Sequence, residues 1–124
     1  MADVSTDFTA YVFAIVDKRD ARGFAALFAP EGRFVFGNAD PIVGPDGIAA
    51  AVEGFFAGIR GLRHELRNRW EDGADTVAEL TVEYDRADDR CVRVPAVTIF
   101  TRDDAGLITD YRIYVDLAPL FAPA

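Results

Sequence analysis

The stretch "PDGIAAAVEGFFAGIRGLRHELRNRW", residues 45–70, changes its hydrophobic period halfway along and decides the fold. Its first part repeats apolar side chains at the spacing of one helical face, namely Ile48, Val52, Phe55, Phe56 and Ile59. From Gly61 onward the residue types alternate with period two, which is typical of a β-strand. We therefore expect a helix from near Asp46 to Arg60 that leads directly into a strand.

The flanking segments continue the same two patterns. Upstream, helical spacing predicts a helix from Ser5 to about Lys18, and "DARGFAALFA" predicts a second one with Asp20 as N-cap and Pro30 beyond its end. "GRFVFGN" is expected to be a short strand, and "TVAELTVEYDR", "CVRVPAVTIFTR" and "LITDYRIYVDL" are expected to be long antiparallel ones. This order indicates a single α+β domain over residues 1–124, with three N-terminal helices packed on one face of a curved, mostly antiparallel sheet.

The composition excludes several classes of protein. Of 124 residues, 51% are hydrophobic and 27% charged, and the net charge of −8 disfavours nucleic acid as a partner. No apolar run reaches the roughly 18 residues that a membrane span needs, and the first residues lack the pattern of a signal peptide. The single cysteine, Cys91, cannot form an intramolecular disulfide. Together, these observations lead us to expect a cytoplasmic protein without membrane contact.

No pattern indicates a metal or an organic cofactor. The one histidine of the chain, His64, has no second ligand at the spacing of a metal site. The turns "GPDG" and "DDAG" do not match a phosphate loop or a dinucleotide fingerprint. We therefore expect a protein that uses neither.

Three segments in this order, "FAALFAPEGRFVFGN", "PIVGPDGIAAAVEGFFAGIRGLRHE" and "AVTIFTRDDAGLITDYRIYVDLAPLF", resemble the SnoaL-like branch of the nuclear transport factor 2-like superfamily. The resemblance covers Phe8 to Phe121. It implies a cone-shaped fold in which a bent sheet wraps around three helices and leaves a pocket. The superfamily includes isomerases, dehydratases, cyclases, epoxide hydrolases and binding proteins, so the fold alone does not select a reaction.

Strand alternation predicts which side chains face that pocket. In "GLRHELRNRW", His64 falls on the apolar side and the arginines on the other. The residues expected to contact a small-molecule ligand are Phe36, Asn38, Phe56, Trp70, Tyr84, Arg112 and Tyr114. The outer sheet face is expected to form a homodimer interface, through Arg63, Glu79, Thr81, Glu83, Thr98 and Phe100.

The last strand cannot be oriented from its composition, because both of its faces mix apolar and polar residues. The resemblance to limonene epoxide hydrolase, whose catalytic aspartate matches Asp116, implies that Arg112, Tyr114 and Asp116 point inward. Asp116 would then be an acid or a base at the pocket floor. The alternative is a structural ion pair between Arg112 and Asp116.

A histidine in an apolar pocket can transfer protons near neutral pH if a carboxylate fixes its tautomer. Asp17, in "IVDKRD", resembles the helix aspartate that pairs with a histidine in scytalone dehydratase and lindane dehydrochlorinase. The candidate catalytic residues are therefore His64, Asp17 and Asp116. The alternative for Asp17 is a capping or structural role at the end of its helix.

Departures from these relatives narrow the chemistry to one base. Leu80 and Val82 stand where the epoxide hydrolase has an arginine and an aspartate, and Phe36 and Val97 stand where ketosteroid isomerase has its two aspartates. We expect a cofactor-free isomerase, lyase or hydrolase acting on a small, largely apolar, oxygenated metabolite. The alternative is a binding or assembly protein without turnover. The terminal "LAPLFAPA" is expected to cover the pocket or a partner.

Overall fold

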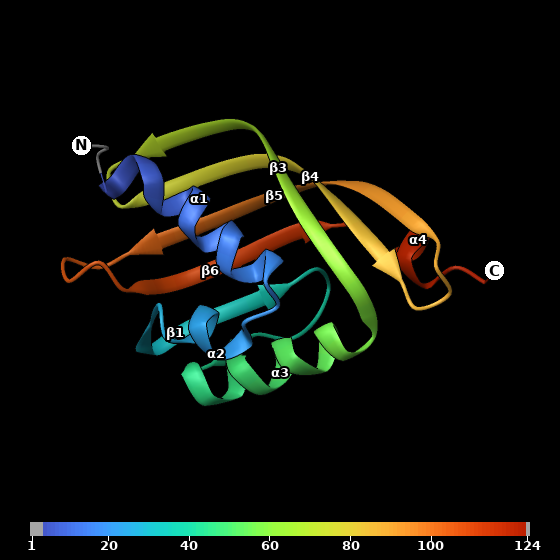
Figure 1. Ribbon diagram of the computed structural model, residues 1–124. Coiled ribbons are helices and arrows are strands. Elements are labelled where there is room, and N and C mark those ends of the chain that lie inside the picture. Colours follow the sequence, from blue (N-terminus) through green and yellow to red (C-terminus); the bar gives the residue numbers. More distant parts are fainter. Residues whose placement is uncertain (1–3, 124) are drawn as a thin grey trace.

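The computed structural model describes residues 4–123, with side chains from Phe8 onward. Its elements are α1 (Val4–Asp17), α2 (Ala21–Ala25), β1 (Phe28–Phe36), β2 (Ile42–Val43), α3 (Pro45–Ala57), β3 (Ile59–Asp72), β4 (Asp75–Arg86), β5 (Cys91–Arg102), β6 (Ile108–Val115) and α4 (Ala118–Phe121). Helices α1, α2 and α3 lie over one face of a strongly bent sheet, and α4 lies beyond its far end (Figure 1). The predicted α+β class is confirmed.

One sheet of six strands has the order β2-β1-β6-β5-β4-β3. All neighbours are antiparallel except β1 and β6, which pair in parallel. The last strand of the chain therefore lies between the first strand and the β3–β5 meander. Strand β3 is an edge strand, and it bends toward the helices and meets the end of α3 (Figure 1).

The second helix is shorter than expected. Asp20 does cap it, because its carboxylate accepts a hydrogen bond from the Gly23 N–H at 2.9 Å. The helix nevertheless ends at Ala25, and Phe28 already pairs with Ile108 of β6. Pro30 consequently lies inside β1, and the expected strand begins earlier than "GRFVFGN".

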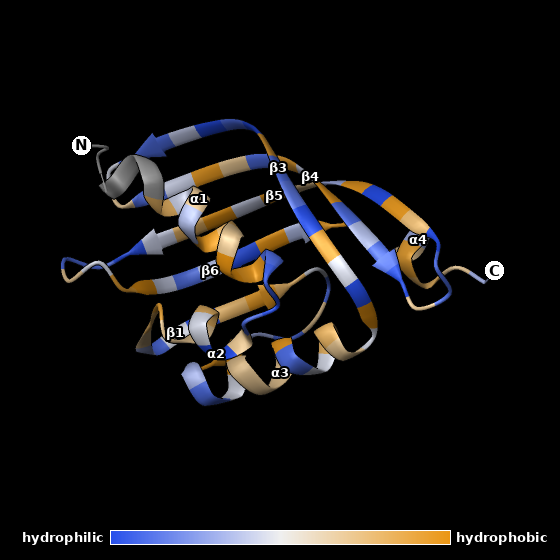
Figure 2. Cartoon of the chain, in the orientation of Figure 1, coloured by the Kyte–Doolittle hydropathy of each residue, from blue (hydrophilic) through white to orange (hydrophobic). Residues whose placement is uncertain are grey.

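The core lies between the concave face of the sheet and the helices. Along the strands, orange and blue segments alternate in Figure 2, as expected for a sheet with one buried face. Phe24 of α2 packs its ring against those of Phe28, Phe34 and Tyr111, at centroid distances of 5.1 to 5.6 Å. Edge-to-face contacts of this kind add to the stabilisation from burial.

A β-bulge reverses the orientation of β3 halfway along. Leu66 pairs with Leu80, but Asn68 pairs with Glu79, so that Arg67 is the extra residue. Side chains after the bulge therefore change faces. Trp70 pairs with Val77 on the outer face and is 56% exposed, so the expectation that it lines the pocket was wrong.

Candidate functional site

An apolar cavity of about 220 Å³ opens between the sheet and helices α1 and α3. Aromatic side chains make up much of its wall, and His64 and two tyrosines are its polar members. The complete lining is Val16, Phe24, Phe34, Phe36, Ala39, Ile42, Ala51, Val52, Phe55, Phe56, Leu62, His64, Tyr84, Tyr111 and Ile113. A wall without Asp, Glu, Lys or Arg suits an uncharged ligand.

His64 reaches the cavity from β3 and is held by Asp17 at the end of α1. The imidazole Nδ1 lies 2.5 Å from the Asp17 Oδ1, and the His64 side chain is 12% exposed. Hydrogen bonds that involve a carboxylate are short and stronger than neutral ones. The contact therefore favours the tautomer in which Nδ1 carries the proton and Nε2 has a free lone pair.

Asp17 has a second contact that is independent of the ring. The backbone N–H of His64 donates to the same carboxylate, at 3.2 Å to both oxygens. Since β3 is an edge strand, this N–H is free of the sheet ladder and is satisfied by the helix instead. Asp17 is thus both the partner of the imidazole and a bridge between α1 and β3.

Tyr84 is the second polar group of the cavity wall. It lies on β4 opposite Leu62, and Val82 is opposite His64, so Tyr84 and His64 are diagonal neighbours on the inner face. Burial raises the pKa of Tyr84 to about 12, so its hydroxyl stays protonated at ordinary pH. Within residues 4–123 its hydroxyl has no hydrogen-bond partner and is available to a ligand.

Tyr111 contributes mainly the face and edge of its ring. It is fully buried, stacks on Phe100 and has a hydrogen bond with the Thr98 side chain. Burial raises its pKa well above the ordinary tyrosine value, although the Thr98 contact works in the opposite direction. Because its hydroxyl is already paired, it is a poorer ligand donor than Tyr84.

The last strand presents the opposite face to that expected. Tyr111 and Ile113 line the cavity, whereas Tyr114 is 54% exposed and Arg112 pairs with Asp110 at 2.8 Å. The register explains this, because Tyr111 pairs with Phe100 and Ile113 pairs with Thr98, both of which are buried on the inner face. The inward assignment of Arg112 and Tyr114 was therefore wrong.

The same register corrects the expected outer face. Phe100 and Thr98 are 1% and 3% exposed and lie under the helices, so they cannot belong to an external interface. The outward residues of β5 are Arg93, Pro95, Val97, Ile99 and Thr101. The assignment of Arg63, Glu79, Thr81 and Glu83 to the outer face agrees with their exposure and pairing.

Asp116 and Asn38 lie in a separate surface hollow near α4. The Asp116 Oδ1 accepts a hydrogen bond from the Ala118 N–H at 2.9 Å and so stabilises the start of α4. This hollow shares Phe36 and Ala39 with the cavity wall, but His64 is not part of it. The structure therefore does not bring Asp116 and Asn38 to the imidazole. It brings Asp17 into contact with the ring and places Phe36, Phe56 and Tyr84 in the wall of the same cavity.

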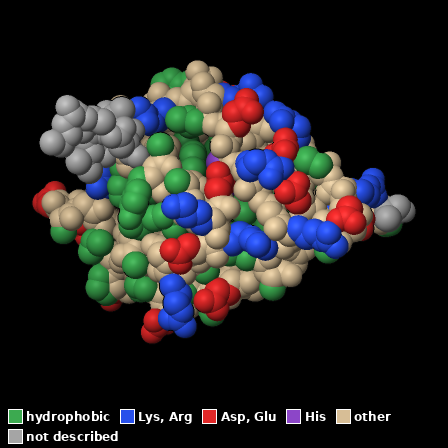
Figure 3. Space-filling view, in the orientation of Figure 1, with side chains coloured by type: hydrophobic (Ala, Val, Ile, Leu, Met, Phe, Trp, Pro, Cys, Tyr) green, Lys and Arg blue, Asp and Glu red, His purple; other side chains and the backbone are tan. Residues whose placement is uncertain are grey.

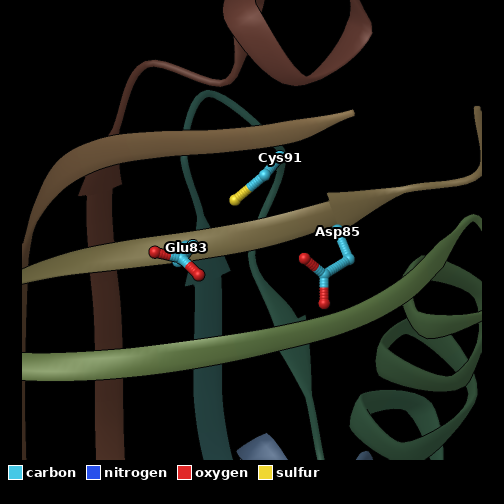
Figure 4. Close-up of side chains that lie close together, drawn as sticks. All are labelled: Glu83, Asp85 and Cys91. Atoms are coloured by element: carbon cyan, nitrogen blue, oxygen red, sulfur yellow. The ribbon is translucent and has the colours of Figure 1, made fainter. Parts of the chain in front are cut away.

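The outer face carries one group of potential metal ligands. Glu83, Asp85 and Cys91 place ligand atoms within 4.8 Å of one another, and their side chains extend from β4 and β5 (Figure 4). Arg63 already donates to both carboxylates and holds the pKa of Glu83 and of Asp85 below their ordinary values. Desolvation and the Glu83 carboxylate raise the pKa of the Cys91 thiol. This group is better described as an arginine-bridged network than as a metal site.

Charge is mixed over the surface that carries the helices, where acidic and basic side chains alternate (Figure 3). In the described part of the chain, no helix has the length and apolar character needed to cross a bilayer. Because charge is mixed on the surface that carries the helices, the apolar cavity is the strongest candidate site for a ligand.

Comparison with known proteins gives a family and a fold. The model of the family described as "SnoaL-like domain" matches residues 8–111. An NTF2-like protein from Burkholderia pseudomallei K96243 superimposes with a TM-score of 0.86 at 16% identity, over 98% of this chain and 100% of that one. No curated protein matches by sequence.

Two further similar structures belong to proteins with a known role or a bound ligand. SalBIII, described as an epoxide hydrolase/cyclase-like enzyme in pyran ring formation in salinomycin, has a TM-score of 0.78 at 17% identity over 91% of both chains. TerC, crystallised with polyporic acid, has a TM-score of 0.80 at 19% identity, over 94% of this chain and 95% of that one. At these identities the similarity establishes the fold.

Proposed function

The chain belongs to the SnoaL-like domain family, and from this premise we propose that it is a cofactor-free acid–base enzyme. Its substrate is a small, largely apolar, oxygenated molecule that binds in the cavity. One observation carries the proposal: the imidazole of His64, paired with Asp17 at 2.5 Å, forms part of a largely apolar wall that has no charged side chain. A positioned base in such a site is a standard arrangement for proton transfer.

His64 is the base in this proposal, and Asp17 is its positioning partner. Nε2 removes a proton from the substrate, and the electron pair of the broken bond passes into the substrate. The imidazolium that forms is stabilised by the Asp17 carboxylate, which already accepts the Nδ1 proton. The same ring then returns the proton to another atom of the substrate or to a leaving group. Isomerisation, elimination and hydration all fit this cycle.

Tyr84 is the group that binds the substrate oxygen. Its hydroxyl stays protonated and donates a hydrogen bond, and its diagonal position next to His64 separates the two groups by about 7 Å or less at Cβ. An oxygen that gains negative charge as the proton leaves is stabilised by this donor. SalBIII, which acts in pyran ring formation, and TerC, which was crystallised with polyporic acid, support the same class of ligand.

The proposal is tested with a panel of ring-containing oxygenated compounds. We expect turnover of at least one of them, and its loss in His64→Ala. Glu65→Ala, the neighbouring residue on the outer face of β3, is the matched control and should retain activity. The variant Asp116→Asn is included because its carboxylate lies in the outer hollow. An inactive Asp116→Asn together with an active His64→Ala would show that the reaction takes place outside the cavity and would refute the proposal.

A second candidate function is ligand binding without turnover. The observation that favours it is the second contact of Asp17, because a carboxylate that joins α1 to the edge strand has a structural role without any reaction. A binder should hold its ligand with an affinity that does not change between about pH 5 and 8, since a working histidine titrates in that range. Turnover that depends on both His64 and Asp17 would exclude a function in binding alone.

We propose a homodimer that associates through the outer sheet face, in a cytoplasmic protein whose single cysteine leaves it without an internal disulfide. Two rows of exposed or half-buried residues support this: Trp70, Val77 and Ile99 in one, Val97 and Tyr114 in the other. An apolar centre bordered by the Arg63–Glu83–Arg93 ion pairs has the composition of a symmetric interface.

Ultracentrifugation tests the dimer. The wild-type protein should sediment at twice the monomer mass, and Ile99→Arg should sediment as a folded monomer, because a charge would be buried at the centre of the interface. Glu53→Arg, an exposed change on α3 away from the sheet, is the control and should stay dimeric. A wild-type monomer at all concentrations would contradict this assignment.

A further inference from the structure

Helix α1 contacts the imidazole of His64 with two side chains, one helical turn apart. Asp17 holds Nδ1 through its carboxylate, and Phe13, four residues earlier, stacks on the ring with a centroid distance of 4.8 Å and an interplanar angle of 16°. Residues at i and i+4 lie on the same helical face, so both come from a single rigid element. The sequence pattern did not single out Phe13, because an apolar residue at this position reads as ordinary core.

From this geometry we propose that Phe13 is a positioning residue of the site, which fixes the plane of the His64 ring while Asp17 fixes one of its nitrogens. This inference rests on the proposed function of the His64–Asp17 pair. Phe13 is 5% exposed and lies outside the cavity lining, so it acts through the imidazole and not on the ligand.

The two contacts restrict different motions of the ring. The terminal torsion of a histidine is broad, so the hydrogen bond at Nδ1 leaves the ring free to swing about that contact. A parallel aromatic ring at stacking distance removes this freedom, because rotation would break the contact or cause a clash. With both in place, Nε2 keeps one direction relative to the cavity. Placement of this kind matters for rate, since small displacements of a catalytic group reduce turnover strongly.

The ring of Phe13 also favours the charged form that appears during proton transfer. The face of an aromatic ring is electronegative and attracts a cation that lies over it. The imidazolium formed after proton abstraction would lie against this face on one side and against the Asp17 carboxylate at its edge. Both contacts therefore stabilise the same intermediate state of the base.

The single histidine makes the test unambiguous, because labelling with histidine that carries ¹⁵N in its ring yields only the two nitrogens of one imidazole. At about pH 9, where a histidine ring is neutral, we expect one protonated and one unprotonated nitrogen in the wild-type protein. In Phe13→Leu the ring can rotate out of its plane and leave the Asp17 carboxylate for part of the time. The two signals should then move toward each other as a second tautomer becomes populated. The matched control is Phe8→Leu, the same change on the same helix, whose ring packs on Phe100 instead.

Turnover provides the second readout. Phe13→Leu should lower kcat about tenfold and leave KM within about twofold, because substrate binding in the cavity is untouched. Phe13→Tyr keeps the planar face and should restore the wild-type spectrum and kcat. If Phe13→Leu does not fold, Phe13→Met is measured in its place, because its flexible side chain fills irregular gaps in a core.

The outcomes separate this inference from the proposed function. A folded Phe13→Leu or Phe13→Met with the wild-type nitrogen spectrum would overturn the positioning role, because Asp17 alone would then be sufficient. If no compound is turned over by the wild-type protein, the proposed function fails, but the nitrogen spectra still decide whether Phe13 holds the ring.

Discussion

Replacement of Asp17 by asparagine separates the two roles of this residue. Asparagine has the same shape, and its carbonyl oxygen can still accept the Nδ1 proton and the backbone N–H of His64, which the carboxylate holds at 2.5 and 3.2 Å. What is lost is the negative charge. The structural bridge between α1 and β3 should therefore survive in Asp17→Asn, while the support for the imidazolium should not.

The size of the stability effect follows from these contacts. Hydrogen bonds to a charged group contribute about 1.5 to 3 kcal/mol and neutral ones about 0.5 to 1.5 kcal/mol, so the change should cost about 1 kcal/mol. The Asp17 side chain is 29% exposed, which favours the lower end. A loss of about 1 kcal/mol lowers the Tm of a domain of this size by about 4 °C. Asp17→Ala should cost more, because it also leaves the strand N–H unpaired.

The effect on turnover should exceed the effect on folding. If the carboxylate stabilises the imidazolium by about 1 to 2 kcal/mol more than an amide does, kcat falls about 5- to 30-fold. Thermal denaturation and initial rates with the same substrate measure both quantities. Asp20→Asn is the control, because Asp20 caps α2 and asparagine caps equally well. A folded Asp17→Asn with kcat within twofold of the wild type would refute a catalytic role for the pair.

Three further changes have defined outcomes. Tyr84→Phe should leave the Tm unchanged, because the Tyr84 hydroxyl has no hydrogen-bond partner among the described residues. It should weaken ligand affinity or lower kcat about 3- to 10-fold, as measured by titration and initial rates. Arg63→Gln should reduce the acid sensitivity of folding. Arg63 lowers the pKa of Glu83 below its ordinary value of 4.5, so this contribution is present at neutral pH and lost as the pH falls through the lowered value. Urea unfolding at pH 7 and 3 should therefore differ less in the variant, and an unchanged difference would contradict the ion pair. Leu120→Ala should cost about 2 to 3 kcal/mol in a denaturant melt, because Leu120 is buried, whereas the exposed Phe121→Ala should cost little; equal effects would show that α4 is not docked.

Much of the fold follows from periodicity in the sequence. The positions of α1 and α3 and the inner faces of β4 and of the first half of β3 come from patterns with one clearly apolar side. Helix α3 nevertheless ends at Ala57, before the expected Arg60, because Ile59 already pairs with Arg86 in β3. The orientation of Leu80, Val82 and Tyr84 is an example, since their neighbours are polar. Such patterns report burial directly, because only one face of the strand touches the core.

The orientation of β6, the exposure of Trp70 and the role of Phe13 could not be predicted, because they depend on contacts between segments that are distant in the sequence. Strand β6 is polar and apolar on both faces, and the pairing of Tyr111 with Phe100 decided which face is buried. The bulge at Arg67 moved Trp70 to the outer face, and nothing in "LRNRW" marks the extra residue. Phe13 gained its place from packing against β3, a strand that begins 46 residues later. Pairing and packing across the chain therefore determined the details of the site.

The parallel pairing of β1 with β6 has a consequence for how the chain reaches this structure. The first strand finds its main partner about eighty residues later, and the strand between β1 and β5 is synthesised after both of them. Contacts of such high sequence separation slow folding, because a long loop must close before they form. Until β6 is inserted, the edges of β1 and β5 both expose unpaired backbone groups. A nascent chain stalled before residue 108 would thus expose two unpaired strand edges. Such edges are prone to aggregation, so we expect this chain to bind chaperones.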